Sequence, residues 1–406
     1  NNRNPAGHIN KQHQPQPVEP GRFNRFMHPH HRQVGLDGLM TGLNLFLEGI
    51  ECKLANIMKQ EMLSIGGDVA VARGAVGCSV EKTDAIIMGS LKQIEKFADK
   101  LSLQPFNLSK VAEDVRKIFS NLNRSTFILK TPVREINIGD RTLIMGIVNV
   151  TPDSFSDGGI LRNLKDAVEY AINLVQMGAD IIDIGGESSR PGSDPVMLEE
   201  ELRRVIPLIR EIKNTIDVPI SVDTTKADVA REALESGAEI INDISAMRND
   251  QNMPEVVAHY GVPVILMHMR GVPKTMQDGD ISYLSVMEEI TRFLEERIET
   301  AESAGIDREN IIIDPGIGFG KRAIDNNVII RRLKELKSLG RPILVGTSRK
   351  AFIGSVTGKP VSDRLDGTAA TVTAAIMNGA NIVRVHDVGF FKGVSRMTDA
   401  IVRSEP

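Results

Sequence analysis

The sequence predicts an α/β protein in which a (β/α)8 TIM barrel follows a small, mainly α-helical domain and a disordered N-terminal tail. Short apolar runs typical of strands alternate with helical stretches eight times over about 260 residues, which is the size and repeat number of such a barrel. The runs are nearly continuous in Ile, Val and Leu, as parallel strands buried on both faces should be. An open doubly wound sheet seldom needs eight evenly spaced repeats, so we expect a closed barrel.

The eight predicted strands cover residues 143–148, 180–184, 219–222, 239–242, 263–267, 310–313, 342–345 and 381–385. The clearest helices between them span residues 164–177, 198–216, 226–236, 283–304 and 328–339. Six returns from helix to strand carry a glycine where the helix should end, because glycine readily adopts the left-handed conformation of a C-cap. These glycines are Gly178, Gly237, Gly261, Gly305, Gly340 and Gly379.

The chain before the barrel changes character twice. Residues 1–35 are rich in Asn, Gln, His and Pro and lack aliphatic periodicity, which predicts a disordered tail. His28, His30 and His31 in this tail could bind a metal, but a solvated tail is the simpler interpretation. Residues 36–125 predict a small, mostly helical domain of unassigned role, with room for a short strand pair near residues 66–77. Residues 126–140 are expected to be a linker to the barrel domain, residues 141–406.

The composition is that of an ordinary globular protein, with 406 residues, 41% hydrophobic residues, 25% charged residues and a net charge of -4. No excess of positive charge points to a nucleic acid or to a membrane surface as a partner. No apolar stretch approaches the ~20 residues of a transmembrane helix, so we expect a cytoplasmic protein. Cys52 and Cys78 are too few and too far apart in the sequence for a zinc site or a disulfide framework, and we expect both to be reduced packing residues.

Polar residues follow the apolar strands at the positions where a barrel places its active site, the C-terminal strand ends. Single polar residues at such positions are more often loop caps or ion pairs, but seven strand ends that all carry them are hard to explain without a function. The Gly316–Gly320 run lacks the spacing of a nucleotide-binding loop, and His259 and His268 are expected to be structural. The candidate residues are Asn149, Phe155, Asp183, Ser189, Arg190, Pro191, Asp223, Asn242, Asp314, Phe319, Ser348, Lys350, Arg384 and His386.

These residues suggest two kinds of chemistry. Asp223, Asn242 and Asp314 supply the acceptors and the amide that would recognise a flat heterocycle with an N–H edge beside a carbonyl. Arg190, Arg384 and His386, with the backbone of the glycine loops, suit a phosphorylated or pyrophosphorylated anion near the last strand. Lys350 can lie between the two sets.

Nine segments within residues 143–388 resemble, in order, the motif series of dihydropteroate synthases. They read MGIVNVTPDSFSDGG, IDIGGESSRPG, SVDT, INDIS, LMHM, IDPGIGFGK, LVGTSRKAFIG, RLDGTAAT and VRVHDV. The resemblance implies that 6-hydroxymethyl-7,8-dihydropterin pyrophosphate and p-aminobenzoate are the substrates, with Mg²⁺ beside the pyrophosphate. It also implies a homodimer and a target for sulfonamides. Ser189 stands where the family more often has Thr, which should alter packing only modestly. The preceding domain resembles an N-terminal extension of some bacterial members.

The resemblance also implies a role for each candidate. Asp223, Asn242, Asp314 and Lys350 would hold the pterin, with Asp183 among the substrate-binding residues. Asn149, Arg384 and His386 would hold the pyrophosphate and its metal, and Asn149 would be the metal ligand. The p-aminobenzoate pocket would be formed by Phe155, Ser189, Arg190, Pro191, Phe319 and Ser348.

Two other functions are consistent with a pterin-reading barrel. A folate-dependent methyltransferase that passes a methyl group to a corrinoid would also use Asp and Asn, but it has no use for the anion-binding residues. A non-catalytic pterin-binding or scaffold protein should have lost some of those residues, and none is lost from this sequence.

Overall fold

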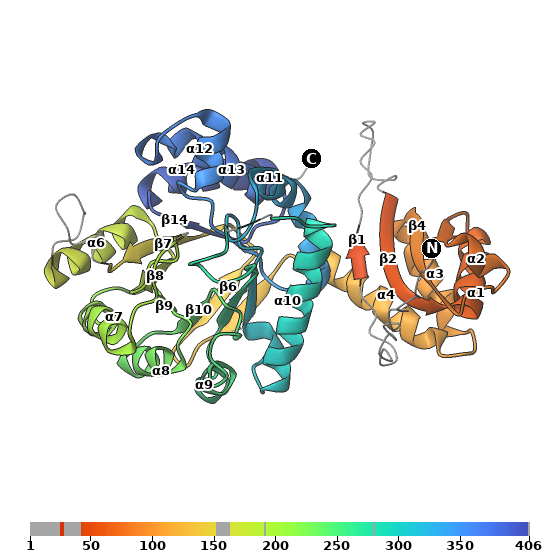
Figure 1. Ribbon diagram of the computed structural model, residues 1–406, viewed down its shortest axis with the longest axis horizontal. Coiled ribbons are helices and arrows are strands. Elements are labelled where there is room, and N and C mark those ends of the chain that lie inside the picture. Colours follow the sequence, from red (N-terminus) through yellow and green to blue (C-terminus); the bar gives the residue numbers. More distant parts are fainter. Residues whose placement is uncertain are drawn as a thin grey trace, which may run out of the picture.

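Eight parallel strands close into a barrel, as predicted (Figure 1). The computed structural model describes residues 25–27, 42–151, 163–190, 192–277, 279 and 281–404. The strand order is β12-β11-β10-β9-β8-β7-β14-β13, and a parallel bridge between Ile313 and Ile343 joins the two ends. The strands are β7 (Leu143–Asn149), β8 (Ile181–Gly185), β9 (Ile220–Asp223), β10 (Ile240–Asp243), β11 (Val264–Met267), β12 (Ile311–Asp314), β13 (Leu344–Val345) and β14 (Ile382–Val385).

Helices surround the barrel on the outside (Figure 1). They are α6 (Leu164–Met177), α7 (Leu198–Ile212), α8 (Ala227–Ser236), α9 (Met253–Tyr260), α10 (Val286–Ser303), α11 (Ala323–Arg332), α12 (Ala351–Thr357), α13 (Leu365–Met377) and α14 (Val388–Val402), with 3-10 turns η1 (Arg308–Asn310), η2 (Leu333–Leu339) and η3 (Val361–Asp363). The predicted helix 328–339 is therefore divided between α11 and η2. All six predicted cap glycines have a left-handed φ, for example 116° at Gly237. None of the described helices is both long and apolar enough to cross a membrane.

The predicted linker 126–140 is in fact a β-hairpin that plugs the N-terminal end of the barrel. It consists of β5 (Phe127–Lys130) and β6 (Glu135–Ile138), which pair antiparallel. Phe127 and Leu129 pack in one cluster with strand residues from inside the barrel, such as Ile181 and Ile312. The alternation of buried and exposed residues in both strands is the period-2 pattern of a sheet with one covered face.

The N-terminal domain is a sheet covered on one face by helices, and the prediction of a mostly helical domain is wrong for residues 42–51. Its strands are β2 (Gly42–Glu51), β3 (Asp68–Val71) and β4 (Lys82–Ser90), and its helices are α1 (Cys52–Leu63), α2 (Arg73–Val76), α3 (Leu91–Ser102) and α4 (Leu108–Asn123). Leu43, Leu45 and Leu47 are buried while the residues between them are not. This alternation of buried and exposed positions is that of a strand.

A short strand, β1 (Arg25–Met27), pairs antiparallel with β2 inside the segment that was expected to be a disordered tail. The remainder of the predicted tail, including His28, His30 and His31, lies outside the described residues. The strand order of this sheet is β1-β2-β4-β3.

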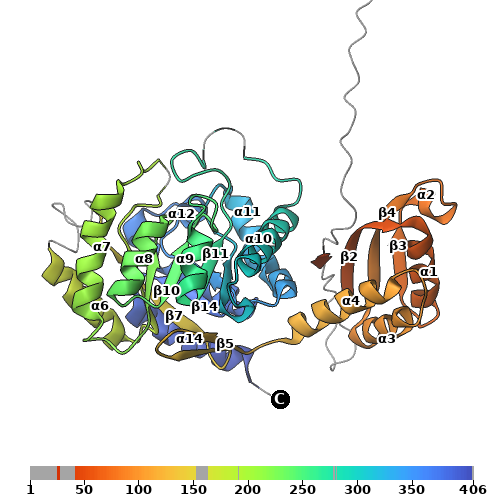
Figure 2. The ribbon, with the colours of Figure 1, turned by 90° about the horizontal axis from the view of Figure 1, so that it is seen from below.

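The N-terminal domain lies beside the barrel and is connected to it through α4 (Figure 2). The Asn121 amide donates to the Ser338 carbonyl at 2.7 Å, and Arg124 forms an ion pair with Glu309. A further ion pair joins Arg292 on α10 to Glu48 on β2, at 3.1 Å. These contacts hold the domain on the outside of the barrel, near α10 and η2.

The two cysteines are both free thiols, as expected, but one of them is not a packing residue. Cys52 is buried but Cys78 is exposed, so only Cys52 is a packing residue. Their Sγ atoms lie 2.9 Å apart although 26 positions separate them in the sequence. Their separation along the chain therefore does not keep them apart in three dimensions.

Candidate active site

The predicted polar residues of the strands meet at the C-terminal ends of the barrel. Neighbouring strands align Asn149 with Gly185, Gly185 with Asp223, and Asp223 with Asn242. Parallel strands in this register end in one row, so a loop residue after one strand is close to the loop residues of the next. Phe155 and Pro191 were predicted to belong to this site but lie outside the described residues.

A buried ion network lies at the centre of this row. Arg384 donates from Nε to Oδ2 of Asp183 at 2.6 Å and from Nη2 to Oδ2 of Asp223 at 2.8 Å. The Asn242 amide also donates to Oδ2 of Asp183, at 3.1 Å. Arg384 was expected in an anion-binding group separate from the carboxylates. The structure brings the two groups into direct contact.

Asp183 is completely buried, and its Oδ1 has no hydrogen-bond partner among the described residues. Leaving a buried carboxylate oxygen without a donor is unfavourable by about 1–3 kcal/mol or more. An unsatisfied acceptor beside a paired one is what a ligand with an N–H group would complete.

Burial raises the pKa of Asp223 to about 7, against the opposing effect of Arg384. Burial also raises the pKa of Asp314, whose Oδ1 accepts the backbone N–H of Gly316 at 2.7 Å. Asp223 can therefore change protonation close to neutral pH. A ligand with a positive or N–H-rich edge would favour the ionised form of both carboxyl groups. Perturbed carboxyls grouped at strand ends are typical of a functional site.

Lys350 and Phe319 come from different loops and lie against each other. The Lys350 Nζ is 4.2 Å from the centre of the Phe319 ring and also donates to the Ile317 carbonyl. Burial lowers the pKa of Lys350 to about 8, while Asp314 opposes that shift. The lysine thus links the loop after β12 to the start of α12, beside a carboxylate of the central row.

His386 and Ser348 form a second pair near the last strand. The Ser348 Oγ is 2.9 Å from Nδ1 of His386 and accepts the His386 backbone N–H at 3.3 Å. Burial and the nearby Arg384 lower the pKa of His386 to about 4, so the imidazole is neutral at pH 7. A neutral His386 would serve an anion as a hydrogen-bond donor rather than as a positive charge.

Ser189 is half-buried and Arg190 is exposed on the loop after β8. A hydrogen bond from α7 stabilises the start of this loop, because Arg204 donates to the Gly186 carbonyl at 2.7 Å. Lys226 donates to Glu187 in the same loop at 2.5 Å and to the buried Glu201 on α7 at 2.6 Å. Lys226 was not predicted from the sequence, because it stands at a helix start with no motif around it.

Lys321 is a second residue that was not predicted to belong to the site, since it was considered only as part of a failed phosphate loop. It is 3% exposed, and its Nζ lies 2.9 Å from Nδ1 of His268. The same atom donates to the carbonyls of His268 at 3.2 Å and Phe319 at 3.1 Å. Burial lowers the pKa of Lys321 to about 7. In the sequence, the position of Lys321 directly after the Gly316–Gly320 run could have indicated that it belongs to the site.

The position of the Asn149 side chain shows whether a metal ion would fit the site. Its side chain is half-buried, and its Oδ1 would lie 3.7 Å from a Cβ placed on Gly185, facing the central row. The carboxamide makes no hydrogen bond with the described residues. An amide oxygen of this kind is a ligand that Mg²⁺ accepts, with phosphate oxygens and waters completing its shell. The described residues contain no cluster of three or more His, Cys, Asp or Glu that could hold a metal without such a partner.

Residues 145–386 match the family model described as "Pterin binding enzyme". The dihydropteroate synthase of Clostridium beijerinckii is 48% identical over 276 residues, which cover 68% of this chain and all of that protein. The "Probable bifunctional folylpolyglutamate synthase/dihydropteroate synthase" of Halobacterium salinarum is 42% identical over 341 residues, 84% of this chain and 40% of that protein. This longer match extends into the residues before the barrel.

The structure is also similar to a crystal structure of Yersinia pestis dihydropteroate synthase in complex with a sulfonamide drug. The TM-score is 0.65 at 41% sequence identity, over 68% of this chain and 100% of that chain. The family model, the sequence identity and the structural similarity of the barrel agree. This chain belongs to the dihydropteroate synthase family of pterin-binding enzymes.

Proposed function

We propose that this chain condenses 6-hydroxymethyl-7,8-dihydropterin pyrophosphate with p-aminobenzoate at the strand ends described above. Different residues there would bind the pterin, the pyrophosphate and p-aminobenzoate. The observation that carries the assignment is the buried network of Arg384 with Asp183 and Asp223, in which Oδ1 of Asp183 lacks a donor among the described residues. A pterin offers N–H groups beside a carbonyl, and such an edge satisfies this oxygen.

The pterin would lie between Asp183, Asp223, Asn242 and Asp314, with Lys350 at its carbonyl side. The three aspartates and the asparagine come from strands or strand ends, so their positions are fixed by the barrel hydrogen bonds rather than by flexible loops. The hydrogen bonds of charged groups contribute about 1.5–3 kcal/mol each, enough to orient the heterocycle in a single way.

The reaction replaces the pyrophosphate on the pterin methylene carbon with the amine of p-aminobenzoate. As the carbon–oxygen bond breaks, positive charge develops on the pterin and negative charge on the leaving group. The carboxylates of Asp223 and Asp314 would stabilise the first, and Arg384 and His386 the second. The aromatic amine is neutral at pH 7, so no strong general base is required.

Arg384 can stabilise the leaving group without releasing the carboxylates. A guanidinium has five N–H donors, and the contacts to Asp183 and Asp223 use two of them. The remaining donors can bind the pyrophosphate, so one side chain would connect the two halves of the site.

Mg²⁺, when bound, would neutralise charge on the leaving pyrophosphate. Asn149 would be its protein ligand, and the pyrophosphate and water would supply the other oxygens. The neutral His386, held by Ser348, would donate to the same anion.

The p-aminobenzoate pocket would be formed by Ser189, Arg190, Phe319 and Ser348, together with Phe155 and Pro191. The sulfonamide complex of the Yersinia pestis relative supports a pocket of this kind. Phe319 offers an aromatic face held in place by Lys350. We further propose that the chain acts as a homodimer in the cytoplasm, which sedimentation analysis and cell fractionation would test.

An assay of pyrophosphate release with both substrates tests the proposal. Release should require p-aminobenzoate, and Asp314→Asn should lower the affinity for the pterin at least about tenfold, since an amide presents the wrong donor pattern. Asp217→Asn is the matched control, because Asp217 is fully exposed. Release that is independent of p-aminobenzoate, or an Asp314→Asn variant with normal pterin binding, would contradict the assignment.

A further inference from the structure

The two cysteine residues of this chain lie in the N-terminal domain, away from the barrel site. Cys52 is the first residue of α1, and Cys78 follows the short helix α2. The distance between their Sγ atoms is 2.9 Å, compared with about 2.05 Å in a disulfide bond. An approach of less than about 1 Å would therefore allow a covalent bond between them.

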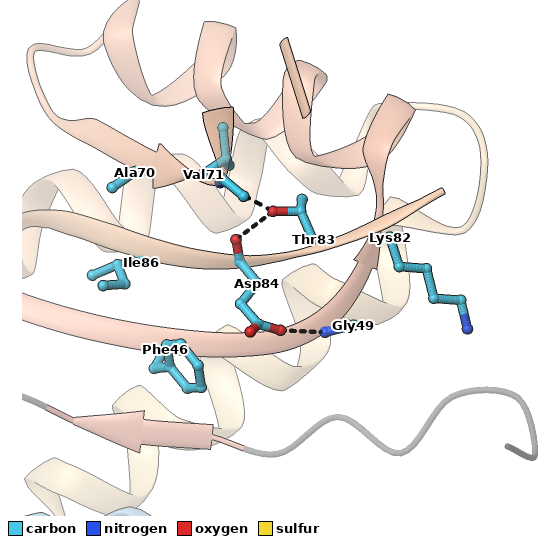
Figure 3. Close-up of a pocket in the computed structure, with 9 residues that line it drawn as sticks. Phe46, Gly49, Ala70, Val71, Lys82, Thr83, Asp84 and Ile86 are labelled. Carbon is cyan, nitrogen blue, oxygen red and sulfur yellow. Dashed lines mark hydrogen bonds between the residues drawn. The ribbon is translucent and has the colours of Figure 1, made fainter. Parts of the chain in front are cut away.

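The short distance is set by the surrounding structure. Residues 72–83 leave the sheet between β3 and β4 and return to it, and the Ala72 N–H donates to Oγ1 of Thr83 at 3.1 Å where the two ends meet (Figure 3). The first turns of α1 also form hydrogen bonds with this segment. The Cys52 N–H donates to the Glu81 carbonyl at 2.9 Å, and the Asn56 amide donates to the Ala75 carbonyl at 2.9 Å. These contacts fix Cys78 over the start of α1.

The two thiols differ in access, which gives them different roles. Cys78 is exposed, and so are its neighbours from Val76 to Lys82, so this stretch can shift without disturbing the core. Cys52 is 3% exposed, and its thiol donates to the Ala75 carbonyl at 2.7 Å. The hydrogen bond with Cys78 and burial raise the pKa of Cys52. The exposed thiol is the one that an oxidant reaches first, and the buried one lies behind it.

We propose that Cys52 and Cys78 form a reversible disulfide, with Cys78 as the thiol that reacts with a small-molecule disulfide and Cys52 as the resolving thiol. The Cys78 thiolate attacks one sulfur of the small disulfide, forms a mixed disulfide and releases one thiol. Cys52 then loses its proton, attacks Sγ of Cys78 and releases the second thiol. Two protein thiols are oxidised, and one small disulfide is reduced to two thiols that carry the two protons.

The bond would fasten the segment 72–83 to the start of α1. This segment forms one end of a cavity of about 460 Å³ on the sheet, lined there by Ala72, Lys82 and Thr83 (Figure 3). Oxidation would thus restrict the movement of one wall of that cavity. It would leave the strand ends of the barrel unchanged.

Oxidised glutathione with the full, folded chain provides the test, with intact mass, peptide mapping and alkylation of free thiols as readouts. The wild-type chain should lose both free thiols and two hydrogens in mass, with one peptide pair linking Cys52 to Cys78. The Cys52→Ser variant should stop at the mixed disulfide of Cys78, because no resolving thiol remains. The Cys78→Ser variant should react little, because Cys52 is buried.

Formation of the internal disulfide from the mixed one should be at least about tenfold faster in the folded chain than in denaturant, because folding holds the two sulfurs at high effective concentration. Circular dichroism and thermal unfolding of each variant serve as the check that it is folded. A folded wild-type chain that stops at the mixed disulfide, or that keeps two alkylatable thiols, would overturn the proposal without bearing on the barrel reaction.

Discussion

Arg384 and Asp183 are 201 positions apart in the sequence and form a buried contact of 2.6 Å between Nε and Oδ2. The same guanidinium reaches Asp223, so one side chain balances two buried carboxylates. Removing one member of a buried ion pair is strongly destabilising, because the remaining charge has no partner. The integrity of the proposed pterin site should therefore depend on the shape of the arginine as well as on its charge.

Arg384→Lys keeps the positive charge but cannot bridge two carboxylates with a planar fork. We expect kcat/KM for the pterin substrate to fall at least about tenfold, as the loss of one charge-assisted hydrogen bond of about 1.5–3 kcal/mol predicts. Steady-state kinetics would measure this. Arg124→Lys is the matched control, because Arg124 also pairs with a carboxylate but lies at the end of α4, next to η1. Equal losses in both variants would indicate a general effect on folding.

The raised pKa of Asp223 predicts how pterin affinity depends on pH. A carboxyl with a folded pKa of about 7 is mostly protonated at pH 6 and mostly ionised at pH 8, so affinity for a ligand that needs the carboxylate should rise over this interval. The stability of the unliganded chain should change in the opposite direction. The contribution of Asp223 to the free energy of unfolding is lost as pH rises from about 4 through about 7. Titration calorimetry across this range would test the first effect and thermal unfolding the second.

Lys321 also has a pKa of about 7, so its contribution to the pH dependence of pterin affinity must be distinguished from that of Asp223. Asp223→Asn should abolish the rise in pterin affinity, whereas Lys321→Met should retain it. If Lys321→Met flattened the profile while Asp223→Asn left it unchanged, the assignment to Asp223 would be wrong.

Lys226 should position the loop that carries Ser189 and Arg190, because it ties Glu187 in that loop to the buried Glu201. We expect Lys226→Met to raise KM for p-aminobenzoate several-fold while changing KM for the pterin much less, and Lys226→Arg to restore most of the difference. Two-substrate kinetics would resolve the two constants. Lys165→Met, at an exposed lysine paired with Glu169, is the control.

Lys226→Met also leaves Glu201 buried without its cation, which should cost about 3–5 kcal/mol of stability. The double variant Lys226→Met with Glu201→Gln should recover stability but not the KM for p-aminobenzoate. Recovery of both would show that Lys226 acts only on stability.

The hairpin β5–β6 should be needed for a stable barrel, although it was expected to be a linker. A chain that begins at Thr126 keeps Phe127 and Leu129 in the barrel plug, whereas a chain that begins at Thr131 loses both. Burial of such side chains contributes about 1.5–3 kcal/mol each, so the shorter chain should unfold at a clearly lower denaturant concentration. Urea unfolding followed by circular dichroism would compare them, and equal midpoints would contradict a structural role for the hairpin.

The barrel and the polar residues at its strand ends can be predicted from the amino-acid sequence alone. Eight buried parallel strands leave continuous apolar runs, and the chain must turn at the end of each, so position along the chain translates directly into position in the barrel. For the same reason Asp223, Asn242 and Asp314 can be assigned to the ends of their strands from the apolar pattern. Local patterns were less reliable at residues 42–51, where alternation of period 2 was mistaken for helical spacing because apolar residues of α1 follow without a break.

Contacts between these residues depend on tertiary packing. The contact of Arg384 with Asp183, the support of Glu187 by Lys226 and the approach of Cys52 to Cys78 all join segments that are distant in sequence. No local pattern records such contacts, because they arise when separate elements pack together and when buried charges must find partners away from water. The sequence therefore determines which functional group each residue carries, while the pKa and the partners of that group depend on burial in the folded barrel.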